Sequence, residues 1–183
     1  MTSLPLNLKE LQTAVAAGGS FRWLYFWGHQ SKSPYRIGKE CFSQWHPSSF
    51  EINQILYPTA EHYMMAEKAR VFGDEEVLEK ILKANTPGEA KALGRQVRGF
   101  SDDVWNQVRI GIVERGNLAK FSQNAELGQY LRTTGEQILV EASPVDRIWG
   151  VGLAATDPLI HDPLQWKGLN LLGFALMKVR SLL

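Results

Sequence analysis

The sequence predicts a mainly helical α+β domain with a small β-sheet. Apolar residues recur at helical spacing through the middle of the chain and at its C-terminal end, whereas β-favouring runs are confined to two short regions. Apolar residues make up 44% of the chain and charged residues 21%, which is the balance of an ordinary globular protein. The length of 183 residues suits one domain rather than two full enzyme domains.

Residues 1–20 are interpreted as a short appendage to the domain formed by residues 21–183. An amphipathic helix is predicted in the appendage from the spacing of Leu8, Leu11 and Val15. The following region, residues 21–57, is rich in aromatic residues and short β-favouring runs. Two to four strands are expected there, notably over residues 21–27 and 49–53, with turn-forming residues at Ser33-Pro34 and His46-Pro47 between them.

Helical signals dominate the middle of the chain, and five helices are predicted, over residues 59–71, 75–84, 89–97, 102–121 and 125–133. The third helix begins in Thr86-Pro87-Gly88-Glu89, a capping box in which the Thr86 hydroxyl accepts the amide hydrogen of Glu89. The remaining elements are expected to be strands over residues 137–141 and 148–153, a loop over 154–167 and a last helix over 169–183.

The composition of the chain excludes several classes of protein. The chain has 20 Lys and Arg against 19 Asp and Glu, so its net charge of +1 lacks the electrostatic footprint of a general nucleic-acid binder. The single cysteine, Cys41, excludes an internal disulfide framework and fits a reducing cytosol. The longest uncharged runs fall short of the roughly 20 residues of a membrane helix. These features predict a cytoplasmic protein with no membrane contact.

Neither a metal nor another cofactor is indicated. The four histidines, His29, His46, His62 and His161, show no close ligand spacing with carboxylates, so we predict no metal. Residues 150–155 have the spacing of a dinucleotide-binding fingerprint, but no helix follows them before Pro158. No nucleophile elbow of a serine hydrolase is present.

The predicted helix over residues 59–71 carries the first candidate site. Glu61 and Lys68 are seven residues apart, which is about two turns and places a carboxylate and an ammonium on one helical face. A solvated helix face is the alternative. Because aromatic and methionine residues occur all round this helix, burial and a shifted carboxylate pKa are also predicted.

Two further clusters have both functional and structural interpretations. Asp146, Arg147 and Trp149 lie in a tight connection between two predicted strands, where pockets are often lined, although Asp146 could instead cap its own turn. Trp105 precedes Arg109 by one helical turn, a geometry that allows cation–π stacking, although core packing is the default for such a tryptophan.

Taken in order, these segments resemble the NADAR family of YbiA-like N-glycosidases. The resemblance runs from about residue 21 to residue 182 and is carried by residues 23–27, Phe42-Ser43-Gln44-Trp45, residues 58–63 with Lys68, Gly94-Arg95, Trp105, Lys120-Phe121, residues 139–141, Asp146, Trp149-Gly150 and residues 168–180. Two positions depart from the family pattern. Gln44 stands where Asn is common and Val151 where some members carry Asp, and both differences concern the substrate.

The resemblance implies a YbiA-like fold and cleavage of a C1′–N bond between ribose and an amine or base. Glu61 and Asp146 would stabilise the positive charge on the ribose, and Lys68 would either bind phosphate or attack C1′ as an amine. The expected substrate-binding residues are Ser43, Trp45, Trp105 and Trp149, with Arg95 and Arg147 on phosphate. The general acid and base stay unassigned.

Four functions follow as hypotheses. The leading one is hydrolysis of ribosylaminopyrimidine phosphates, the phosphorylated small-molecule intermediates of riboflavin biosynthesis. Its rival within the family is removal of ADP-ribose from guanine bases of nucleotides or nucleic acid. A binding module for ADP-ribose without turnover, and a structural domain whose aromatic residues only pack, complete the set. The sequence does not indicate the oligomeric state.

Overall fold

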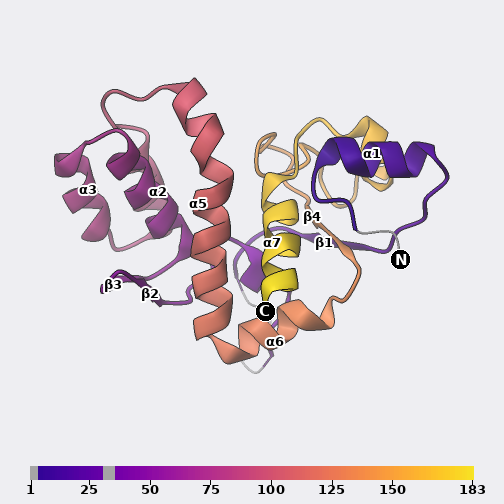
Figure 1. The fold of residues 1–183 in the computed structure, drawn as a ribbon, viewed down its shortest axis with the longest axis horizontal. Coiled ribbons are helices and arrows are strands. Elements are labelled where there is room, and N and C mark those ends of the chain that lie inside the picture. Colours follow the sequence, from indigo (N-terminus) through magenta and orange to yellow (C-terminus); the bar gives the residue numbers. More distant parts are fainter. Residues whose placement is uncertain (1–3, 31–35) are drawn as a thin grey trace.

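The computed structural model describes residues 4–30 and 36–183, and it confirms a mainly helical fold with small sheets. Helices α5 (Asp102–Gln123) and α7 (Leu171–Leu182) stand side by side at its centre (Figure 1). Helices α2 and α3 and the strands β2 and β3 lie on one side of this pair, and β1, β4 and α1 lie on the other. The central helices therefore separate two groups of elements.

Two sheets of two strands each provide the β-structure among the described residues. Strand β1 (Trp23–Phe26) pairs in parallel with β4 (Ile138–Glu141), so that Trp23 lies opposite Ile138. Strands β2 (Phe50–Ile52) and β3 (Ile55–Tyr57) form an antiparallel hairpin. These strands confirm the β-regions predicted near residues 21–27, 49–53 and 137–141, whereas the predicted turn at Ser33-Pro34 lies outside the described residues.

The strand predicted over residues 148–153 is wrong. These residues form bends on either side of Val151, although Val151 is fully buried and Leu153 almost so. Their backbone amides are used locally: the Asp146 carboxylate accepts from the amides of Ile148 and Trp149, and the Asp146 carbonyl accepts from the amide of Gly152. A short apolar run that is buried in irregular structure can have the composition of a strand without forming the hydrogen-bond ladder of one.

Helices α2 (Ala60–Val71), α3 (Glu75–Leu82) and α4 (Pro87–Gly94) form a group packed against one another. The predicted capping box is confirmed, because the Glu89 amide donates to the Thr86 hydroxyl at 3.1 Å and the Glu89 carboxylate accepts from the Asn85 amide at 2.8 Å. Thr59 caps α2 in the same way through the His62 amide. Each helix of this group therefore begins at a residue that its own sequence specifies.

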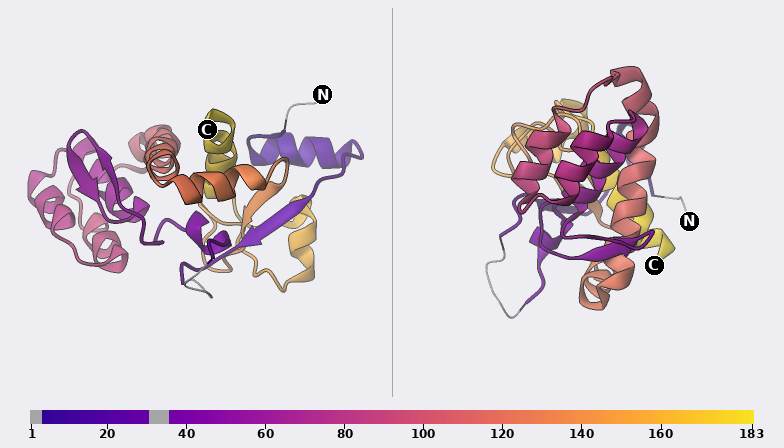
Figure 2. Two further views of the ribbon diagram at one scale, coloured as in Figure 1. Left: turned by 90° about the horizontal axis from the view of Figure 1, so that it is seen from below. Right: turned by 90° about the vertical axis from the view of Figure 1, so that its left-hand side faces the viewer.

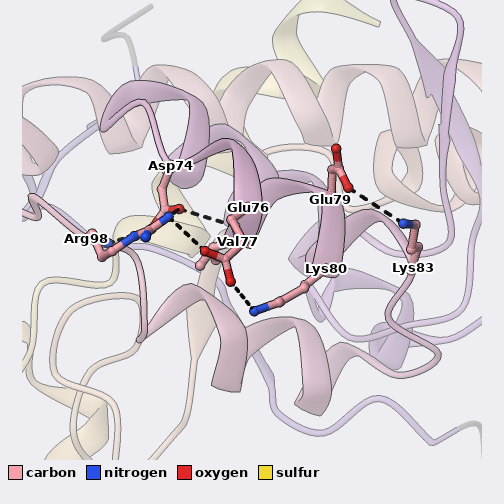
Figure 3. A network of polar contacts seen from close by, with 7 residues as sticks. All are labelled: Asp74, Glu76, Val77, Glu79, Lys80, Lys83 and Arg98. Atoms are coloured by element: carbon pink, nitrogen blue, oxygen red, sulfur yellow. Dashed lines mark hydrogen bonds and ion pairs between the residues drawn. The ribbon is translucent and has the colours of Figure 1, made fainter.

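A polar network links α3 to the segment that follows α4 (Figure 3). The buried carboxylate of Asp74 accepts from the Val77 amide at the start of α3 and from both the amide and the guanidinium of Arg98, which follows α4. The Arg98 side chain holds the pKa of Asp74 well below its usual range. The exit of α4 is thereby tied to the beginning of α3.

The N-terminal segment packs on the rest of the chain. Helix α1 (Leu8–Ala16) begins at Asn7, whose side chain accepts from the Glu10 amide. Leu11 is fully buried, and the Gln12 side chain donates to the carbonyl of Pro163 at 3.0 Å. Pro163 belongs to a 3₁₀ helix (Pro163–Gln165) that follows another one (Pro158–His161) within the region predicted as a loop.

Two further helical elements connect the parts described above. Helix α6 (Ala125–Thr133) turns back from the end of α5, and a 3₁₀ helix (Lys39–Phe42) leads toward β2 (Figure 2). Within residues 4–30 and 36–183, no helix combines the length and the apolarity that a bilayer-spanning segment requires.

Candidate active site

A cavity of about 270 Å³ opens between the two groups of elements. Helices α2 and α4 line it from one group, the end of β4 and the turn at residues 146–149 line it from the other, and Leu172 of the central helix α7 also contributes. The segment of residues 43–45 contributes a third wall. Residues far apart in the sequence therefore meet at one place in the fold.

Seven of the nine predicted site residues line this cavity, namely Ser43, Trp45, Glu61, Lys68, Arg95, Asp146 and Trp149. The other two are not among the lining residues. Trp105 is buried in α5, and its predicted contact with Arg109 is not among the cation–π pairs of the described residues. Arg147 is exposed and does not line the cavity.

Glu61 is the most buried carboxylate of the cavity, because it lies in the first turn of α2 with only 3% of its surface exposed. Its amide donates to the carbonyl of Gln44 at 2.9 Å, which fixes the start of the helix on the opposite wall. Oxygen Oε1 is buried and has no hydrogen-bond partner among the described residues. Burial raises the pKa of Glu61 to about 7, Lys91 and the Trp45 side chain oppose this shift, and Asp146 adds to it. The predicted burial of this helix is thus confirmed.

Asp146 combines both interpretations that the sequence left open. Its Oδ1 accepts from the amides of Ile148 and Trp149, each at 2.8 Å, so it caps its own turn. The same side chain lines the cavity. The cap therefore holds a carboxylate in a fixed position at the cavity wall.

A third carboxyl belongs to Glu141 at the end of β4, in the segment 139–141 that carries the family resemblance but for which no site role is predicted. Burial raises its pKa to about 8, Asp146 and Glu61 add to the shift, and Lys91 opposes it. The signal in the sequence is a glutamate at the end of an otherwise apolar strand, Ile138–Glu141.

Three cations line the cavity from the helical side. Lys68, on the same face of α2 as Glu61, places its ammonium 4.1 Å from the centre of the Phe100 ring. Burial lowers the pKa of Lys68, Asp102 opposes the shift and Arg95 adds to it. Lys91 of α4, which the sequence analysis missed, lies 5.8 Å from the Trp45 ring centre. The third cation, Arg95, is exposed at the end of α4.

The wall formed by residues 43–45 is held from behind by α5. Lys120 is fully buried and donates to the carbonyls of Cys41 and Ser43 at 2.7 and 2.9 Å. Asn117, one turn earlier, donates to the side-chain carbonyl of Gln44 at 2.8 Å. Gln44 itself also lines the cavity.

The arrangement supplies three carboxyl groups, three cations and two indole rings around one small space. Such a set suits a substrate that carries an anionic group and develops positive charge during the reaction. Among the described residues, no group of three or more His, Cys, Asp or Glu side chains is placed to hold a metal ion.

Known proteins that are similar to this chain include N-glycosidases and a solved structure. The model of the NADAR domain matches residues 25–183. An N-glycosidase of Acanthamoeba polyphaga mimivirus is 41% identical over 165 residues, covering 87% of this chain and 95% of that protein. The N-glycosidase YbiA of Escherichia coli is 32% identical, covering 76% and 79%. The NMR structure of E. coli YbiA superposes with a TM-score of 0.70 at 25% identity, covering 98% of this chain and 92% of that one.

A chloroplastic riboflavin biosynthesis protein of Zea mays, PYRR, is 32% identical over 77% of this chain and 23% of its own length.

Proposed function

The chain belongs to the NADAR family and is an N-glycosidase of the YbiA type, and from this premise we propose that it hydrolyses the C1′–N bond of a ribosylated, phosphorylated amine. The ribosylaminopyrimidine phosphates of riboflavin biosynthesis are the proposed examples of this substrate class. The observation that carries the proposal is the buried Glu61 carboxylate, whose Oε1 has no hydrogen-bond partner among the described residues and which lines the cavity together with Lys68, Lys91 and Arg95.

The charge that develops in the reaction explains the need for this carboxylate. Breaking a C1′–N bond leaves positive charge on C1′ and the ribose ring oxygen, so a nearby anion stabilises the transition state more than the ground state. In a site shielded from water, this interaction is stronger than in bulk solvent. Glu61 and Asp146 occupy the cavity wall in positions suited to this role.

The phosphate has its own partners in the proposal. Lys68, Lys91 and Arg95 line the helical side of the cavity, and together they favour a phosphate group there. Trp45 and Trp149 supply flat apolar surfaces for a base or ribose. Arg147 does not line the cavity, so the proposal gives it no role.

The size of the cavity favours a small substrate. Its volume of about 270 Å³ lies just below the roughly 300 to 1,000 Å³ of typical ligand pockets. A ribosylaminopyrimidine phosphate has one phosphate and one base, whereas ADP-ribose on guanine has two phosphates and two bases. A relative named as a riboflavin biosynthesis protein also supports the smaller substrate class.

The test is a mass-spectrometric assay of purified protein with two substrates, a ribosylaminopyrimidine phosphate and an ADP-ribosylated guanine oligonucleotide. We expect wild type to release the aminopyrimidine and ribose 5-phosphate. The Glu61→Gln variant keeps the size of the side chain and removes its charge, so turnover is expected to fall by at least about 100-fold. Glu114→Gln, on α5 outside the cavity lining, is the control and should keep full activity.

Each result has a clear meaning. Release of ADP-ribose from the oligonucleotide, with no hydrolysis of the ribosylaminopyrimidine phosphate, would show that the substrates are ADP-ribosylated guanine bases instead. Full activity in a Glu61→Gln protein with a normal melting temperature would remove Glu61 from the mechanism. Tight ADP-ribose binding without release from either substrate would contradict turnover as the function of this chain.

A further inference from the structure

Glu141 is a cavity residue whose backbone is fixed on both sides. Its amide donates to the side-chain oxygen of Asn170 at 2.9 Å, and its carbonyl accepts from the Val151 amide at 3.0 Å. Asn170 also donates to the carbonyl of Leu139 at 2.9 Å, so one buried side chain clamps the end of β4. The Glu141 carboxyl is therefore presented to the cavity from a rigid support.

Its carboxyl group has an unused oxygen. Oε2 is buried and has no hydrogen-bond partner among the described residues, although a buried polar atom normally has one. Since Glu141 lines the cavity, the missing partner can be supplied by a molecule bound there. A purely structural glutamate at this place would instead be expected to have its hydrogen bonds satisfied within the protein.

The charged groups that face Glu141 are the carboxylates of Glu61 and Asp146 and the ammonium of Lys91. Burial and the two carboxylates raise the pKa of Glu141 to about 8, against the opposing effect of Lys91. For Glu61, the cations Lys91 and Arg95 and the Trp45 side chain all favour the charged form, so its pKa reaches only about 7. Of these two glutamates, Glu141 therefore keeps its proton to the higher pH.

We propose that Glu141 is the general acid that protonates the nitrogen leaving C1′. The inference rests on the proposed N-glycosidase function and assigns the proton donor that this function leaves open. Glu61 then remains the anion that stabilises the ribose cation, so the two glutamates take separate roles. Two carboxyl groups whose surroundings separate their pKa values commonly divide acid and anion roles in this way.

The step balances without a further reactant. Glu141 transfers its proton to the glycosidic nitrogen as the C1′–N bond breaks, and the bonding electron pair leaves with the amine. Water then forms a C1′–O bond, and the proton that it loses returns to the Glu141 carboxylate. The products are the free amine and ribose 5-phosphate, and the enzyme regains its starting state.

The experiment compares two substrates that differ in their need for a proton. One is the ribosylaminopyrimidine phosphate, and the other is 4-nitrophenyl riboside 5-phosphate, whose nitrophenolate leaves unprotonated. For Glu141→Gln, we expect kcat on the amine substrate to fall by roughly 100- to 10,000-fold and kcat on the nitrophenyl substrate by less than about 10-fold. Glu61→Gln should lose activity on both substrates, and Glu114→Gln on neither.

The pH dependence of wild type provides a readout that needs no variant. With the amine substrate, kcat/KM should fall as the pH rises above about 8, because Glu141 loses its proton. With the nitrophenyl substrate, this decrease should be absent. A third readout is the ¹³C signal of labelled glutamate carboxyl groups, in which one group titrates above pH 7 in wild type and is missing in Glu141→Gln.

The outcomes separate this inference from the proposed function. Wild-type cleavage of the amine with full activity in Glu141→Gln overturns the role of Glu141 alone. An equal loss on both substrates, identical pH profiles, or a Glu141 carboxyl that is ionised at pH 7 also overturns it. If wild type cleaves no ribosylated amine, the proposed function is wrong, and so is the assignment of Glu141 as its general acid.

Discussion

At the scale of single residues, Lys120 shows how a buried charge can shape a site that it does not enter. Burial lowers the pKa of its ammonium to about 7, and its two hydrogen bonds end on the carbonyls of Cys41 and Ser43. Those carbonyls belong to the chain that leads into Ser43 and Trp45 on the cavity wall. Lys120 is accordingly a positioning residue, whereas Lys68 and Lys91 face the cavity itself.

The distinction predicts different kinetic effects for the lysines. In Lys91→Met, loss of one charged hydrogen bond to phosphate is expected to raise KM by about 10- to 100-fold with a smaller effect on kcat. Steady-state kinetics on phosphorylated and dephosphorylated substrate measure this effect, which should vanish for the dephosphorylated one. Lys83→Met, at an exposed position on the same side of the molecule, is the control. An unchanged KM would exclude Lys91 from phosphate binding.

At the scale of elements, the site depends on close contact between α7 and β4. A Cβ atom at Gly173 of α7 would collide with the carbonyl oxygen of Leu139 in β4. This carbonyl already accepts from the Asn170 side chain, so it has little freedom to move away. The absence of a side chain at residue 173 therefore sets the distance at which α7 supports the strand that ends in Glu141.

We expect Gly173→Ala to destabilise the protein. Overpacking against fixed backbone costs about 1 to 3 kcal/mol, which corresponds to a loss of roughly 2 to 12 °C in melting temperature for a chain of this size. Gly111→Ala is the matched control, because its new Cβ would meet only the end of the Arg115 side chain at 3.7 Å in the interior of α5. Calorimetry of the two variants provides the comparison. Equal melting temperatures would show that α7 can shift without cost.

Helices were predictable from the sequence because their signals are local. The capping box at Thr86 and the apolar spacing of the last helix describe the chain within a few residues, and both are confirmed. The turn at residues 148–153 depends on hydrogen bonds to Asp146 and on burial beneath other segments, which the local pattern does not contain. Tertiary context here overrides β-propensity.

The site was predictable to the extent that its residues lie on recognisable motifs. Glu61, Lys68 and Asp146 met these conditions and do line the cavity. Lys91 lies on no such motif, and Glu141 lies in the matching segment 139–141 but has no predicted role there, because a helical lysine and a strand-end glutamate gain a role only from the neighbours that the fold gives them. Trp105 shows the reverse case, in which a conspicuous residue is buried in the core.

At the scale of the whole molecule, the cavity carboxyls link the site to stability. The folded-state pKa values of Glu61 and Glu141, about 7 and about 8, lie above the value of 4.5 for a free side chain. Such groups bind more protons in the folded state, so the stability that they contribute is full below about pH 4.5 and is lost as the pH rises through 7 and 8. The opposite shift of Lys120 contributes a gain in stability between about pH 7 and 10.5.

A glutamine at either site should therefore stabilise the protein in alkaline solution. We expect Glu141→Gln to melt near the wild-type temperature at pH 5 and on the order of 5 °C higher at pH 9. Comparison with wild type at each pH cancels the contribution of Lys120. The measurement is a series of thermal melts between pH 5 and 9, and a difference independent of pH would show that Glu141 is not held protonated by the fold. An active site that lowers stability in this way is a common cost of function.

The parallel pairing of β1 with β4 has a consequence for the synthesis of the protein. Strand β1 ends at Phe26 and its partner begins only at Ile138, so the ribosome must make more than a hundred further residues before the pair can form. At ordinary translation rates, this interval lasts on the order of ten seconds. Throughout it, Trp-Leu-Tyr-Phe emerges as an unpaired apolar segment of the nascent chain. A chaperone that shields such segments should therefore raise the yield of soluble protein in cells, most of all when the chain is made rapidly.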